Sequence, residues 1–336
     1  MLRLLLCTSA TFTAFAPALA EEKPRLADLD RTRLAEAFRL ADAVGNKVWP
    51  DWDTAPFAVL LVTPDHEFLI RHAKPSEDFT PLGEDAVLKT KVWSRKRTFS
   101  PELLATFPAV GGVPTIVIGQ AENTTARTST RWVITLLHEH FHQLQNSQPR
   151  YFAEVDSLGL ARGDKTGMWM LNYDFPYSKR EVKEQFATMA QSLADALAAM
   201  GKADFAGKRD AYLEARRKFY SLLSADDAKY LSFQVWQEGI ARYTEYHVAK
   251  LAAAEYETSK EFAALKDYTS FEDEARRIRT GIEKELSSVQ LDKAKRTGFY
   301  ALGAGEGLLL DAWKPEWRKK YFDEKFTLEP HFKAGK

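Results

Sequence analysis

The segment WVITLLHEHFHQLQ, residues 132–145, contains three of the seven histidines of this 336-residue chain. Its apolar side chains follow helical spacing and gather on one side, which predicts a helix packed against a core. His138 and His142 lie about 40° apart on another face, one turn from each other, with Glu139 beside them. His140 falls inside the apolar arc, so we expect it to be a core histidine satisfied by a hydrogen bond.

Residues 138–142 form the pattern HExxH, in which two imidazoles at i and i+4 bind zinc and the glutamate acts as general base. A catalytic zinc also needs a third protein ligand and an open position for water. One known extension has glycine three residues after the second histidine and a third histidine three residues later. Here these positions are Gln145 and Gln148, which excludes the metzincin type.

The third ligand is expected from a later helix. The segment SFQVWQEGIARYTEYH, residues 232–247, offers Glu238. Glu154 and Asp156 are nearer to the histidines in sequence and are alternatives for this position. Glu238 is otherwise an ordinary surface or ion-paired helix residue.

Two further charged residues share the helical face of Glu238. Arg242 is a candidate for binding a substrate carboxylate or the oxyanion, but we expect it to pair with Glu238 or Glu245. Glu245 is a candidate for orienting a ligand imidazole, because metal-bound histidines usually donate their second ring N–H to an acceptor.

These two segments resemble the gluzincin group of zinc metallopeptidases, whose members carry HExxH on one helix and a glutamate ligand, often within Glu-Gly-x-Ala, on a later one. Residues 238–241 match that form. The resemblance implies a zincin-like fold, in which an edge strand of the sheet holds extended substrate beside the metal helix. Residues 113–118 would be that strand. Because 95 residues separate His142 from Glu238, an inserted helical pair is expected at about 180–223.

Peptide hydrolysis needs an activated water, a proton acceptor and a group that stabilises the developing oxyanion. A zinc-activated water and Glu139 as general base would supply the first two. For the third, resemblance to gluzincins that use a downstream tyrosine makes Tyr300 the candidate, in TGFYALGAGEG at 297–307. The alternative is that Tyr300 is an ordinary core aromatic.

The distribution of patterns along the chain predicts an α+β fold: a small N-terminal mixed sheet with the active-site helix, followed by a mostly helical C-terminal half. Residues 57–72 are typical of a hairpin, and Ser224 with Asp227 forms a capping box. Further strands are expected at 88–98 and 111–120, a long functional loop at 149–179, and helices at 29–46, 180–200, 206–223, 226–253, 259–286 and 296–313.

Residues 1–20 have one basic residue, an apolar run and a final Ala18-Leu19-Ala20, which is typical of a cleaved export signal. The alternative is a membrane anchor, but Pro17 interrupts the apolar run well short of the roughly 20 residues of a span. Cleavage near Ala20 predicts a secreted or periplasmic protein without a membrane anchor. It also removes Cys7, the single cysteine, so zinc thiolate sites are excluded.

The mature chain is expected to comprise a subdomain at 21–148 that carries the HExxH helix and a helical subdomain at 149–336 that carries the third ligand. Its formal charge would be −1, with no basic stripe, so nucleic acid is not an expected partner. The predicted function is an exported zinc metallopeptidase that uses one catalytic ion on peptide or protein substrates. The alternatives are a catalytically inactive zincin-like peptide- or metal-binding protein and a metal-free helical binding or assembly protein.

Overall fold

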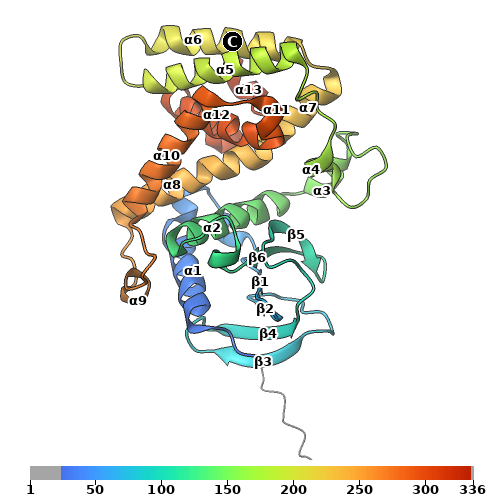
Figure 1. Cartoon of the computed structure of the whole chain (residues 1–336), viewed down its shortest axis with the longest axis vertical. Helices are drawn as coiled ribbons and strands as arrows, with labels where there is room; N and C mark the ends of the chain where they lie inside the picture. The colour runs from blue at the N-terminus through green and yellow to red at the C-terminus, as the bar shows by residue number, and fades with distance from the viewer. Residues whose placement is uncertain (1–23, 334–336) are drawn as a thin grey trace, which may run out of the picture.

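The computed structural model describes residues 24–333, and within them one N-terminal helix precedes the strands, while the other helices follow them (Figure 1). The fold is therefore α+β, as predicted. The expected export signal at 1–20 lies outside the described residues. The strands form one mixed sheet in the order β3-β4-β2-β1-β6-β5, in which β1 and β6 are parallel and the other neighbours antiparallel. The strands are β1 (Val59–Val62), β2 (His66–Ile70), β3 (Thr80–Asp85), β4 (Thr90–Lys96), β5 (Leu104–Val110) and β6 (Val113–Gly119).

The helices are α1 (Asp28–Val48), α2 (Ser129–Asn146), α3 (Tyr151–Asp156), α4 (Trp169–Asn172), α5 (Arg180–Ala198), α6 (Phe205–Ser221), α7 (Ala225–Gln234), the π-helix η3 (Val235–Gly239), α8 (Ile240–Glu255), α9 (Lys260–Ala263), α10 (Phe271–Ser288), α11 (Leu291–Ala294), α12 (Gly298–Trp313) and α13 (Glu329–Phe332). Four short 3₁₀ turns join them, namely η1 (Trp52–Thr54), η2 (Ala121–Asn123), η4 (Lys295–Thr297) and η5 (Pro315–Lys320). None of the helices within residues 24–333 is long and apolar enough to cross a membrane.

The sheet is buried on both faces at its centre. Alternate residues of β1 and β6 point to opposite faces. On one face, Val59, Leu61, Ile116 and Ile118 join the large core to which α1 and α2 contribute. A smaller apolar cluster, which includes Leu60, covers the other face. Helix α2 therefore packs against this face of the sheet, next to β5 and β6 (Figure 1).

The structure confirms the hairpin within 57–72, as β1 and β2, and the strands expected within 88–98 and 111–120, as β4 and β6. It adds β3 and β5, which we did not predict. The assignment of 113–118 as the edge strand is wrong, because these residues lie in β6, between β1 and β5. The edge strand beside α2 is β5. Its sequence shows no clear strand pattern, because most of its side chains are half-buried and its register with β6 is irregular around Pro108.

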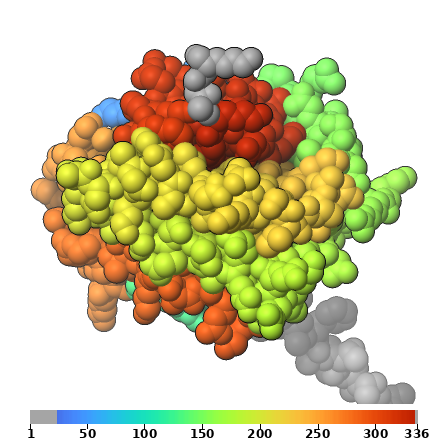
Figure 2. Space-filling view, turned by 90° about the horizontal axis from the view of Figure 1, so that it is seen from above, coloured from blue at the N-terminus to red at the C-terminus, as the bar shows by residue number. Residues whose placement is uncertain are grey.

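The predicted helices are present with shifted bounds. Ser224 caps α7 by accepting a hydrogen bond from the backbone N–H of Asp227, as expected. The range 226–253 is continuous but contains the π-turn η3, and 259–286 divides into α9 and α10. The expected pair at about 180–223 is present as α5 and α6, which lie side by side at the top of the helical part (Figure 2). This pair accounts for the long separation between the HExxH helix and the segment that carries Glu238.

Candidate metal centre

Helix α2 brings the HExxH side chains together at the middle of the molecule. His138, Glu139 and His142 are only 6–8% exposed. The Nε2 atoms of the two histidines lie 3.1 Å apart, and the two rings are one helical turn from each other. One donor atom from each of the three residues falls within 4.8 Å of the others. This His-Glu-His group could hold a metal ion.

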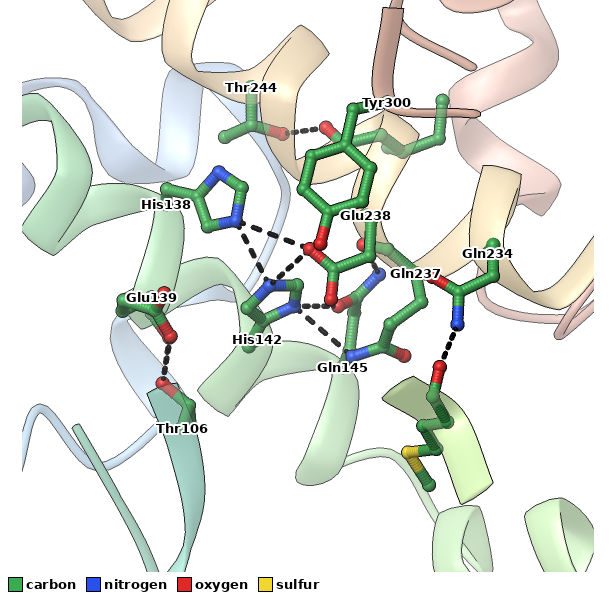
Figure 3. A network of polar contacts seen from close by, with 12 residues as sticks. Thr106, His138, Glu139, His142, Gln145, Gln234, Gln237, Glu238, Thr244 and Tyr300 are labelled. Atoms are coloured by element: carbon green, nitrogen blue, oxygen red, sulfur yellow. Dashed lines mark hydrogen bonds and ion pairs between the residues drawn. The ribbon is translucent and has the colours of Figure 1, made fainter. Parts of the chain in front are cut away.

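The helical part adds a carboxylate to this group. Oε2 of Glu238 lies 3.7 Å from Nε2 of His138 and 3.6 Å from Nε2 of His142 (Figure 3). Two donor atoms bound at about 2.0–2.1 Å to one tetrahedral ion lie about 3.3 Å apart. The triangle of two nitrogens and one oxygen is therefore close in size to one face of a tetrahedral coordination shell, which has three of its four positions.

Hydrogen bonds to Nδ1 fix how each imidazole presents its Nε2. The Nδ1 of His138 lies 2.7 Å from Oε1 of Glu245, and the Nδ1 of His142 lies 2.7 Å from Oε1 of Gln145. The amide nitrogen of Gln145 donates to the carbonyls of Trp236 and Gln237, so its oxygen must face the ring. This contact is shorter than the 3.1 Å between Nδ1 of His142 and the amide nitrogen of Gln237, and it assigns the ring proton to Nδ1.

Three acceptors consequently face one another. With both Nδ1 atoms protonated, each Nε2 directs a lone pair at the other and at the carboxylate of Glu238. Lone pairs at such distances repel unless a proton or a cation lies between them. The donor set therefore fits a bound metal ion.

The electrostatics of the site favour positive charge at the same point. Burial opposes ionisation of Glu238, but its close contacts with His138 and His142 hold the pKa of that carboxyl well below its usual range. Burial also lowers the pKa of His138, yet the neighbouring carboxylates of Glu238 and Glu245 outweigh it and raise the pKa to about 10. A divalent ion between the two Nε2 atoms and Glu238 would supply that positive charge, while Glu245 accepts the Nδ1 proton of His138.

Glu139 is held by the edge strand. The hydroxyl of Thr106, in β5, lies 2.8 Å from Oε2 of Glu139 and 2.9 Å from its backbone carbonyl (Figure 3). The carboxylate is thus fixed on the strand side of the imidazole pair, near but not within the nitrogen-oxygen triangle.

Close helix packing brings Glu238 to this position. A Cβ added to Gly239 would lie 2.5 Å from Cα of Gly303, and one added to Gly303 would lie 2.7 Å from Cα of Gly239. The backbones of η3 and α12 therefore touch at these two glycines. Tyr300, one turn before Gly303, comes to lie beside Glu238 as a result (Figure 3). A π-turn such as η3 is frequent at functional sites.

Tyr300 contacts the candidate third ligand. Its hydroxyl lies beside the carboxylate of Glu238 (Figure 3), and burial together with this carboxylate raises the pKa of Tyr300 well above its ordinary value. A guanidinium N–H of Arg296 donates to the same hydroxyl oxygen. Tyr300 is therefore a proton-bearing phenol at the site and not a core aromatic remote from it.

Other candidates lie elsewhere. Arg242 pairs with Glu285 at 2.6 Å, so the expected pairing with Glu238 or Glu245 is wrong. Of the alternative ligands, Glu154 pairs with Lys325, and Asp156 is exposed at the end of α3.

His140 is a core residue, as predicted. It stacks on Phe57 with 3.8 Å between ring centroids, and its Nδ1 lies 2.8 Å from Oε1 of Gln143. Burial lowers the pKa of His140 to about 3, so the ring is neutral.

The site also contains residues that the sequence did not reveal. Thr106 belongs to a strand that we did not predict, and Arg296 lies in the turn η4 at the start of the range expected as a helix at 296–313; neither stands in a recognisable motif. Gln145 had a possible signal, since it lies three residues after His142 on the same helix and can reach its ring.

Comparison with known proteins found no matching family model, no matching curated protein and no matching solved structure. The candidate site is therefore defined by its geometry. The geometry supports the His-Glu-His group as a possible metal site, and the gluzincin resemblance rests on the two sequence motifs.

Proposed function

We propose that the chain is an exported zinc-dependent metallopeptidase that hydrolyses peptide bonds. The observation that supports this most is the convergence of two imidazole nitrogens and the Glu238 carboxylate within 3.1–3.7 Å, with Glu139 next to them. Two histidines and one glutamate are a known ligand set of catalytic zinc, whereas Ca²⁺ and Mg²⁺ prefer oxygen ligands alone.

His138, His142 and Glu238 would hold the ion. When bound, zinc supplies a Lewis acid that makes water nucleophilic near neutral pH and polarises a carbonyl group. Glu139 accepts the proton of the attacking water and later donates it to the leaving amine. The hydrogen bond from Thr106 to one carboxylate oxygen keeps Glu139 in position for both transfers.

The Tyr300 hydroxyl would stabilise the oxyanion. Arg296 donates to its oxygen, so the phenolic proton is directed away from Arg296 and toward the Glu238 side of the site. A donor that is already oriented at the place where negative charge develops lowers the barrier without reorganisation.

An extended peptide would bind along β5. Among the described strands, β5 has a neighbour on one side only, and such an edge can pair with a substrate backbone. Thr106 links β5 to Glu139, so a peptide on this edge would pass the general base. Export rests on the sequence of residues 1–20.

The test is a comparison of wild-type protein with Glu139→Gln. Wild-type protein should contain one zinc per chain and cleave members of a broad fluorogenic peptide library. Glu139→Gln should retain zinc by mass spectrometry and lose about 10²–10⁴-fold in kcat. The matched control Glu181→Gln changes an exposed glutamate of α5 and should behave as wild type.

Retained hydrolysis by Glu139→Gln would refute the mechanism. Bound metal with no turnover of any peptide by wild-type protein would instead support an inactive zincin-like binding protein. Purified protein free of metal and unable to take up zinc would contradict both.

A further inference from the structure

Arg296 lies next to the candidate site, where it contacts Tyr300, and forms no direct ion pair with a described carboxylate. It belongs to η4, directly before α12, and is partly buried. Its guanidinium donates to the hydroxyl oxygen of Tyr300, which lies beside the carboxylate of Glu238 (Figure 3). A single phenol therefore separates this cation from the candidate third ligand.

Its lack of an ion pair distinguishes Arg296 from the most buried arginines. Arg33, Arg95 and Arg216 each form an ion pair with at least one carboxylate at 2.8 Å or less. Within residues 24–333, no carboxylate lies within ion-pair distance of Arg296. Burial lowers the pKa of Arg296, but Tyr300 and the charge of Glu238 outweigh it, so the guanidinium stays charged with no described carboxylate in direct contact.

The guanidinium of Arg296 has further N–H donors available for a ligand. It carries five N–H donors in a planar fork that matches both oxygens of a carboxylate, and one of them goes to Tyr300. Two exposed lysines, Lys293 and Lys295, lie in the same turn region and add positive potential around it. This corner of the site therefore attracts anions, although the formal charge of the whole chain is zero.

The position of the guanidinium suits a substrate group. In Figure 3, Tyr300 and Glu139 lie on different sides of the imidazole pair. A peptide whose scissile carbonyl meets Glu139 from the β5 side would extend toward α12 beyond it. Because Arg296 contacts Tyr300, a carboxylate on a peptide that extends past Tyr300 would meet its remaining donors.

We propose that Arg296 binds a carboxylate group of the substrate, so that this site favours peptides that carry a free carboxylate close to the scissile bond. The inference rests on the proposed function. The carboxylate is either the C-terminus of the peptide or an acidic side chain. Binding of the C-terminus would make the protein a carboxypeptidase.

The experiment compares three peptides. The first is a free acid, the second is its C-terminal amide, and the third is the same amide with glutamate in place of one glutamine near the C-terminus. Wild-type protein should show a kcat/KM about tenfold higher for at least one carboxylate peptide than for the neutral amide, as one charge-assisted hydrogen bond predicts. The preferred peptide identifies the source of the carboxylate.

Two variants locate the effect. Arg296→Met should abolish the preference, so that the three peptides are cleaved with equal kcat/KM, at whatever common level the lost contact with Tyr300 sets. The matched control Lys295→Met removes the same charge from the neighbouring exposed residue and should keep the preference. Equal cleavage of the three peptides by wild-type protein would overturn the inference. So would an equal loss on all three in Arg296→Met, which would mean that Arg296 acts only through Tyr300.

Calorimetry with zinc-loaded Glu139→Gln protein separates the inference from the proposed function. This variant should bind the preferred carboxylate peptide about tenfold more tightly than the neutral amide, and adding Arg296→Met should remove the difference. Such binding without any cleavage by wild-type protein would refute only the hydrolase. Cleavage without a carboxylate preference would refute only the role of Arg296.

Discussion

The contact between Gly239 and Gly303 makes a strong test of how the third ligand is positioned. In Gly303→Ala, the new Cβ would lie 2.7 Å from Cα of Gly239 and 2.7 Å from the carbonyl oxygen of Val235. Both are backbone atoms that no rotamer change can move. Alanine gains about 1 kcal/mol over glycine in a helix, while overpacking costs about 1–3 kcal/mol. We expect the free energy of unfolding to fall by up to about 2 kcal/mol.

The same substitution should weaken metal binding, because η3 must move away from α12 and Glu238 moves with it. Urea unfolding measures the first effect, and competition with a chromogenic zinc chelator measures the second. Gly207→Ala is the control, since no atom lies within 4 Å of the added Cβ in α6, and it should leave stability equal or higher. Gly303→Ala with unchanged stability and unchanged zinc affinity would refute this account of the site.

Three further predictions concern other parts of the molecule. Glu245→Ala removes the acceptor for Nδ1 of His138 and should lower zinc affinity by about 10- to 100-fold in the same chelator assay; an unchanged affinity would contradict the role of that hydrogen bond. Thr106→Val should lower kcat by about tenfold through loss of the hydrogen bond to Glu139, with zinc content unchanged, and equal kcat would argue against positioning by β5. Burial lowers the pKa of His72 below its ordinary 6.5, although a backbone carbonyl partly offsets this, so the folded protein favours the neutral ring. The contribution of His72 to the free energy of unfolding is therefore present above pH 6.5 and is lost as the pH falls through that value toward the folded pKa. Urea titrations between pH 5 and 8 should show this loss in wild-type protein and a flatter profile in His72→Gln.

The local patterns of the chain predicted most of the elements. The spacing in 132–145 predicted a buried helix with His138 and His142 on one face, because helical geometry relates residues four apart whatever surrounds them. The hairpin within 57–72 and the five C-terminal helical ranges were predicted for the same reason. The structure brings Glu238 and Tyr300 beside the histidines, and their chemical roles stay predictions.

What depends on packing between distant segments could not be predicted. Strand β5 is defined by pairing with β6, and its own sequence contains a proline. The pairing of Arg242 with Glu285 joins α8 to α10, and helical angles within α8 carry no information about α10. The position of Arg296 next to Tyr300 also could not be predicted, because it depends on the turn η4 between α11 and α12.

The interposed pair α5 and α6 also has a consequence for how the centre is assembled. The histidines and Glu238 are joined by a long stretch of chain, and closing such a loop costs conformational entropy before any bond to the ion offsets it. The nitrogen pair on α2 can form early, but the oxygen ligand arrives only when the helical half has docked. An ion bound by the histidines and by Glu238 would then link the N-terminal and helical halves. Removal of the ion with a chelator should therefore weaken the packing between the two halves before the sheet unfolds.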